Sequence, residues 1–117
     1  MPVEDSLRSW VDNFWDAEIL PSLTEYIRIP NKSVMFDPHW AAHGHMARAI
    51  DLVTSWVADQ QVPGLTWTVH EQDGRTPVIL MQIDGGAPGN VLIYGHLDKQ
   101  PEFDGWHEHL GPWEPVM

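Results

Sequence analysis

The hydrophobic pattern changes its period once along the chain, and this change constrains the fold more than any other feature. Up to Gln60 the apolar residues recur at helical spacing, whereas from Leu65 onward they alternate with polar residues. Pro63-Gly64 lies between the two regions and is a helix-stop signal. The sequence therefore predicts an α/β chain in which N-terminal helices pack on a sheet that follows them.

The first helix is expected over residues 6 to about 27, where apolar side chains form a stripe. Asp5 or Ser6 is its predicted N-cap. Pro21 interrupts the run and should kink the helix or divide it into two abutting helices. Ile29-Pro30 should end the segment, because the residue before a proline avoids helical geometry.

The second helix is expected to start at Asp37-Pro38, which combines an N-cap with a proline at the first helical position, and to continue to about Gln60. Its buried face should carry Met46, Ile50, Val53 and Val57, with Trp56 alongside. His43 and His45 form a His-x-His on this predicted helix. Because residues two apart on a helix point in different directions, we expect solvated or capping histidines here rather than metal ligands.

The strand signals follow Gly64. Residues 65–70 alternate and predict a strand with one buried face, and residues 78–83 predict a second strand. Asp73-Gly74 is a turn signal that joins the two into a hairpin. Residues 84–90 are rich in glycine and predict a loop. The wholly apolar run Val91-Leu92-Ile93-Tyr94 predicts a central strand that is covered on both faces.

Composition excludes several classes of function. The net charge of −11 argues against binding to nucleic acid and to anionic membrane surfaces. No cysteine is present, so any metal must be held by histidines and carboxylates. No signal peptide and no apolar run long enough to span a bilayer are visible. The expected location is therefore the cytoplasm.

His96 and Asp98 directly follow the predicted central strand. Ligands bind at the carboxyl ends of strands in open α/β sheets, and residues two apart in an extended chain face the same side. Imidazole is the commonest metal ligand, and a neighbouring carboxylate can accept its other ring proton. His-x-Asp at this place is therefore one half of a plausible zinc site. By spacing alone the signal is weak and a plain surface histidine is the simpler explanation, because a catalytic zinc site needs three protein ligands.

The surrounding residues resemble a signature of one metallopeptidase superfamily. This superfamily includes carnosinase, the cytosolic nonspecific dipeptidases, aminoacylase, acetylornithine deacetylase and succinyl-diaminopimelate desuccinylase. Its members carry Gly-His-x-Asp after a buried strand, often followed by Gln-Pro, then a Trp and a Pro-Phe/Trp-Glu-Pro stretch. The matching segments here are Leu20-Pro21-Ser22-Leu23, Tyr26-Ile27-Arg28-Ile29-Pro30, Tyr94 to Pro101, Gly105-Trp106 and Gly111 to Pro115. Lys99 departs from the hydrophobic residue that is common at its position, which leaves the subfamily open.

The resemblance implies roles for two residues of the catalytic centre. His96 matches the first zinc-binding histidine, and Asp98 matches the catalytic-centre aspartate that supports this histidine. The complete enzymes are expected to be homodimers that hold two zinc ions, bridged by a carboxylate and a water, and use a glutamate as general base. They would hydrolyse a small peptide or an N-acyl amino acid, and a dipeptide is the expected substrate here.

The other residues of that centre have no counterpart within the 117 residues. The bridging aspartate, which normally follows a Gly-Arg-Gly stretch, is missing, as are the base, the other ligands and the smaller lid domain. We therefore expect residues 1–117 to be the N-terminal part of the catalytic domain and to be inactive alone.

Two further interpretations stay open. His107 and His109 could complete a mononuclear site with His96, although solvated loop histidines are the simpler explanation. Trp106 and Trp113 could line a substrate cleft or pack the loop onto the sheet. The alternative function is a non-enzymatic, acidic, Trp-rich module that binds a partner.

Overall fold

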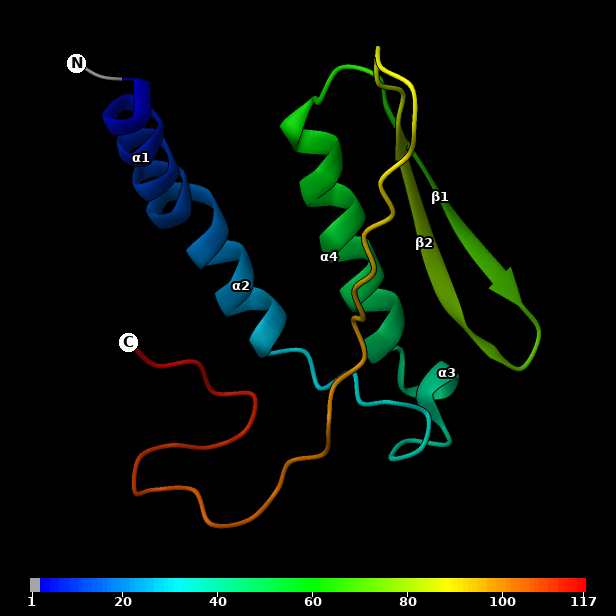
Figure 1. The fold of residues 1–117 in the computed structure, drawn as a ribbon. Helices are drawn as coiled ribbons and strands as arrows, with labels where there is room; N and C mark the ends of the chain where they lie inside the picture. Colours follow the sequence, from blue (N-terminus) through cyan, green and yellow to red (C-terminus); the bar gives the residue numbers. More distant parts are fainter. Residues whose placement is uncertain (1–2) are drawn as a thin grey trace. The chain divides into compact units, whose positions relative to one another are not determined.

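The computed structural model describes residues 3–117 and contains helices and one two-stranded antiparallel hairpin (Figure 1). The chain forms two compact units. One comprises the chain up to Pro30 together with Glu102–Met117, and the other is Asn31–Pro101. None of the helices described is long and apolar enough to cross a bilayer. The mixed helix and strand content agrees with the predicted class.

The first unit contains helix α1 (Val3–Phe14), the π-helical turn η1 (Trp15–Ile19) and helix α2 (Leu20–Ile27). The main-chain N–H of Leu20 donates to the oxygen of Trp15, five residues back. A wider turn at this place accommodates Pro21, which has no N–H and whose ring would crowd the preceding turn. The predicted interruption at Pro21 is therefore confirmed, and it takes the form of a π turn.

The predicted N-cap of the first helix is wrong. Asp5 and Ser6 already lie inside α1, which includes Val3. The hydroxyl of Ser6 donates to the main-chain oxygen of Val3 at 2.8 Å. This back-bonding is typical of serine within a helix, whereas a cap would accept from an N–H.

The predicted second helix is two helices, α3 (Trp40–His43) and α4 (His45–Gln60). Gly44 separates them because it adopts a left-handed conformation with φ of 74°, which glycine reaches without steric cost. The predicted end at Gln60 is confirmed. The buried residues of α4 are Met46, Ala49, Ile50 and Val57, whereas Val53 and Trp56 are half-buried.

The predicted hairpin is confirmed as β1 (Leu65–Gln72) and β2 (Arg75–Ile83), joined at Asp73-Gly74. Its predicted buried face is only partly formed. Leu65 and Val69 are half-buried, but Trp67 between them is exposed. A two-stranded ribbon has little surface to bury unless another layer covers it.

The predicted central strand at residues 91–94 is not present in the described chain. The sheet has two strands, and residues 84–98 are irregular. Val91, Leu92, Ile93 and Tyr94 are 85–95% exposed. A strand requires a neighbour for its N–H and C=O groups, and within residues 3–117 no strand pairs with this run. Its apolar composition alone was therefore insufficient to bury it.

Candidate metal and catalytic site

The backbone around His96 is positioned by the loop that follows Pro30. The N–H of Lys99 donates to the oxygen of Asn31 at 2.9 Å, and the N–H of Ser33 donates to the oxygen of Lys99 at 2.8 Å. These bonds form a short parallel bridge between Lys32 and Lys99. Two segments that lie far apart in the sequence are thereby held side by side.

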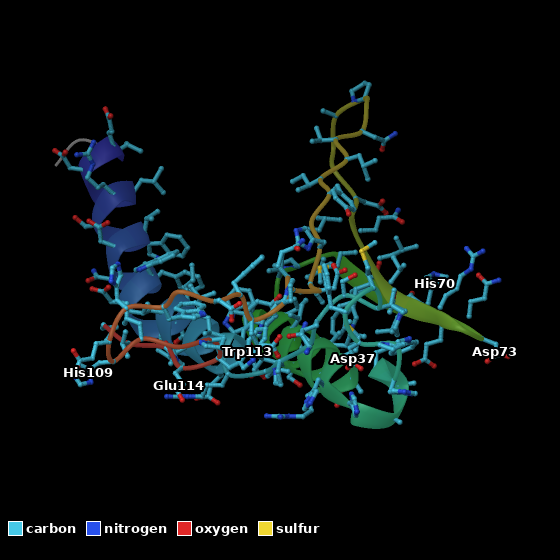
Figure 2. All side chains as sticks on the ribbon, turned by 90° about the horizontal axis from the view of Figure 1, so that it is seen from below. Asp37, His70, Asp73, His109, Trp113 and Glu114 are labelled. Carbon is cyan, nitrogen blue, oxygen red and sulfur yellow. The ribbon has the colours of Figure 1, made fainter. Side chains whose placement is uncertain are left out.

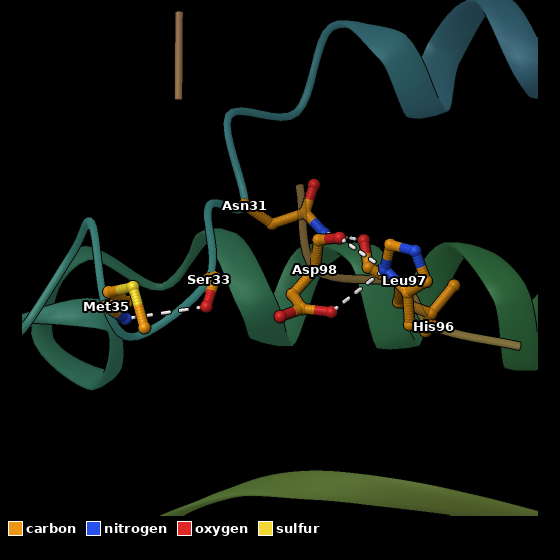
Figure 3. Close-up of polar contacts among 6 residues, drawn as sticks. All are labelled: Asn31, Ser33, Met35, His96, Leu97 and Asp98. Atoms are coloured by element: carbon orange, nitrogen blue, oxygen red, sulfur yellow. Dashed lines mark hydrogen bonds and ion pairs between the residues drawn. The ribbon is translucent and has the colours of Figure 1, made fainter. Parts of the chain in front are cut away.

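Asn31 strengthens this junction from a buried position. Its side chain is 1% exposed, and its Nδ2 donates to the main-chain oxygen of Leu97 at 2.8 Å (Figure 3). Its Oδ1 is buried and has no hydrogen-bond partner among residues 3–117. Because a buried amide is costly unless it is bonded, the bond to Leu97 is the contact that justifies an asparagine here.

His96 and Asp98 contact each other, as the His-x-Asp spacing predicts. Nδ1 of His96 lies 2.8 Å from the main-chain oxygen of Asp98 and 3.1 Å from its Oδ1 (Figure 3). A carbonyl and an ionised carboxylate can only accept hydrogen bonds, so Nδ1 must carry the ring proton. The neutral imidazole then keeps its lone pair on Nε2. A metal-binding histidine needs this arrangement.

The pair lies at a hollow within the second unit, with a volume of about 420 Å³. Three elements line it: the buried side of α4, the strand β2 and the segment that carries His96. The side chains that α4 and β2 contribute are apolar except for Thr76, and the other polar groups come from the His96 segment. The lining is Met46, Ile50, Val53, Thr76, Pro77, Val78, Ile79, Met81 and Tyr94 to Asp98. An apolar hollow with a few polar groups at one side is typical of a small-molecule site.

Lys99 introduces a titratable cation beside the pair. Partial burial lowers the pKa of its ammonium group from 10.5 to about 8, because a low-dielectric surrounding disfavours the charged form. The position therefore carries a charge that varies within the range of mildly alkaline pH.

A complete metal centre is not formed. Across residues 3–117, no group of three or more histidine, aspartate or glutamate side chains is arranged to hold a metal ion. His107 and His109 belong to the unit that contains Glu102–Met117. Nε2 of His109 lies 3.6 Å from a carboxylate oxygen of Glu108, and both side chains are almost fully exposed. Figure 2 shows His109 on the irregular C-terminal segment.

The two tryptophans of that segment do not line the hollow, whose lining residues all come from Asn31–Pro101. The indole N–H of Trp106 donates to the main-chain oxygen of Glu102 at 2.8 Å. Trp113 is half-buried. For Trp106, the bond within the segment favours a role in loop structure.

A second histidine–aspartate pair was missed by the sequence analysis. Nδ1 of His43 lies 2.8 Å from Oδ2 of Asp37, and the N–H of His39 donates to Oδ1 of Asp37 at 3.2 Å. The hydrogen bond from His43 holds the pKa of the Asp37 carboxyl below its ordinary value. Asp37 (labelled in Figure 2) lies in the turn before α3, which begins at Trp40 with His39 as its N-cap, so the helix start predicted at Asp37-Pro38 is wrong. No signal for this contact is present in the sequence, because in a helix that began at Asp37 the residue six positions on would not face its carboxylate.

Comparison with protein-family models gives no match, and comparison with curated proteins gives no significant match. The metal-binding role of His96 and the supporting role of Asp98 therefore rest on the motif and the local geometry. Both roles stay predictions.

Proposed function

We propose that the chain is the N-terminal part of the catalytic domain of a zinc-dependent hydrolase that cleaves peptide or amide bonds in small substrates, most simply dipeptides. The observation that carries this proposal is the contact between Nδ1 of His96 and the carboxylate of Asp98, at the mouth of an apolar hollow. This contact leaves Nε2 as the metal-binding atom. It is the geometry in which a carboxylate orients a histidine ligand and raises its basicity.

The residues present fit one part of such a centre. His96 would contribute one ligand through Nε2, and Asp98 would hold the ring and its tautomer. Zinc, when bound, would polarise the scissile carbonyl and lower the pKa of a water molecule. A catalytic site needs three protein ligands, so further carboxylates and a general base must come from residues outside the described chain.

The apolar run of residues 91–94 supports the same proposal. Four consecutive side chains that are 85–95% exposed would be covered if further strands of a larger domain paired with them. The hollow beside α4 and β2 would then form part of the interior or of the cleft of that domain. In this proposal, residues 91–94 become the central strand that the sequence predicts.

The proposal is tested by the coding sequence beyond the codon for Met117 and by the activity of its product. We expect an in-frame Gly-Arg-Gly stretch followed by an aspartate, and zinc-dependent hydrolysis by the extended protein on a panel of dipeptides. His96→Gln should lower kcat/KM of that protein by more than about 10³-fold, and Asp98→Asn by about 10–100-fold. The 117-residue chain with added zinc should show no turnover. A fully active His96→Gln variant of the extended protein would contradict the proposal.

A second candidate function is the binding of a protein partner by an acidic, Trp-rich surface. The observation that favours it is the apolar stripe of α1, in which no residue is buried. Trp10 stacks on Phe14 with ring centroids 5.0 Å apart and is still 59% exposed. If this stripe is a binding surface, Trp10→Gln should leave the Tm almost unchanged. A large drop in Tm would show instead that Trp10 belongs to a core.

A further inference from the structure

The turn between α3 and α4 gathers three histidines beside Asp37. The ring centroids of His39 and His43 are 6.2 Å apart, and those of His43 and His45 are 6.0 Å apart. The left-handed conformation of Gly44 makes the second approach possible, because a continuous helix would direct His43 and His45 to different sides. None of these side chains takes part in the site around His96.

His43 is held in the form that binds a metal ion. Its Nδ1 lies 2.8 Å from Oδ2 of Asp37, whose side chain is 8% exposed. An ionised carboxylate only accepts, so a neutral His43 carries its proton on Nδ1 and its lone pair on Nε2. The side chain of His43 is 52% exposed, so ions in solution reach it. A carboxylate that accepts the other ring proton is the usual support of a histidine ligand.

His39 lies one helical turn before His43. The N–H of His43 donates to the main-chain oxygen of His39 at 3.1 Å, so the two residues stand four apart on one helical turn and share a face. Two histidines at this spacing form the helical half of known zinc sites. Two imidazoles on one tetrahedral zinc have ring centroids about 5 Å apart. The 6.2 Å between the His39 and His43 centroids is longer than this, so metal binding requires the exposed His39 side chain to move toward His43.

We propose that His39 and His43 form a surface site for a divalent transition-metal ion of the zinc, nickel or copper class, and that Asp37 is the positioning residue for His43. Imidazole ligands select this class over magnesium and calcium. Because residues 3–117 contain no ready group of three donors, water completes the coordination. His45 is not a ligand in this proposal, since its Nδ1 is buried and has no partner in the described chain.

The test is titration calorimetry of the 117-residue chain with Zn²⁺ and with Ni²⁺ at neutral pH. We expect one ion per chain, and an affinity at least ten-fold weaker in His39→Gln and in His43→Gln. His45→Gln and His70→Gln are matched controls and should stay within two-fold of the wild type, since His70 is an exposed histidine of the hairpin. Unchanged affinity in either ligand variant would overturn the site, and so would an equal loss in a control. A loss of binding in His96→Gln, with unchanged affinity in the His39 and His43 variants, would place the ion at the proposed hydrolase centre and overturn this site.

Imidazole ¹⁵N NMR spectra test the positioning role of Asp37, which a melting curve does not report. Asp37→Asn should release the fixed tautomer of His43 and weaken the affinity for Zn²⁺ about ten-fold. A His43 ring that keeps its proton on Nδ1 in this variant would refute the positioning role. Since His39 is exposed, the His39→Gln variant is expected to fold, and it keeps the site testable if the Asp37 variant does not.

Discussion

The two histidine–aspartate pairs of this chain use the same contact in different surroundings. In both, Nδ1 of the histidine faces a carboxylate oxygen, at 2.8 Å for His43 and Asp37 and at 3.1 Å for His96 and Asp98. The side chain of Asp37 is 8% exposed, whereas that of Asp98 is 41% exposed. The comparison shows that the contact alone does not define a role. The buried carboxylate organises a turn, and the exposed pair lies at a hollow and is free to meet a ligand.

The largest stability effect is expected away from both carboxylates, at Asn31. Asn31→Ala removes the bond from Nδ2 to the oxygen of Leu97, which anchors the backbone that carries His96 and Asp98. Chemical denaturation should show a loss of about 1–2 kcal/mol in the free energy of unfolding. The amide hydrogens near Lys99 should also exchange faster. An unchanged free energy of unfolding would mean that the His96 segment is held by other contacts.

Asp37→Asn tests the buried pair. The pKa of Asp37 lies below its ordinary value of 3.8 because His43 donates to the carboxylate. The ionised group therefore stabilises the folded chain above about pH 4, and this contribution is lost as the pH falls through the lowered pKa. We expect the variant to melt several degrees below the wild type near pH 7. Melting curves recorded at decreasing pH should converge below pH 3.8, and a difference that does not depend on pH would contradict this origin.

Lys99 directly follows Asp98 of the exposed pair, and its lowered pKa can be tested by its reactivity. With a pKa of about 8, roughly half of its amine is free at pH 8, against less than about 1% for a lysine near 10.4. An amine-acylating reagent at pH 8 should therefore modify Lys99 at least ten-fold faster than Lys32, the chain's other lysine. Mass spectrometry of the digested protein gives the two rates. Equal rates, or a midpoint for Lys99 above pH 10, would show that burial does not lower its pKa.

The smallest effect is expected for Asp98→Asn in the 117-residue chain. The partners are largely exposed to solvent, and exposed ion pairs contribute little to stability. The free energy of unfolding should change by less than about 0.5 kcal/mol, which is well below the change for Asn31→Ala. If Asp98→Asn lowered the free energy of unfolding more than Asn31→Ala does, Asp98 would be a structural residue and the contrast between the two pairs would be wrong.

Local features were predictable from the sequence because they depend on neighbouring residues. Pro30 and Pro63 mark helix ends, Asp73-Gly74 makes the hairpin turn, and the two-residue spacing brings His96 and Asp98 together. The interruption at Pro21 was also predictable, since the missing N–H belongs to the proline itself. Each of these outcomes follows from backbone chemistry over a few residues.

The tertiary structure decided which segments meet and which apolar residues become buried. The hydrogen bond from Asn31 to Leu97 joins residues 66 positions apart, next to the parallel bridge between Lys32 and Lys99, and no local pattern specifies it. The break at Gly44 brings the rings of His43 and His45 to 6.0 Å, where the hydrophobic period had suggested a continuous helix. Residues 91–94 are apolar enough for a central strand, yet they remain exposed. Burial requires a partner surface, and composition cannot supply one.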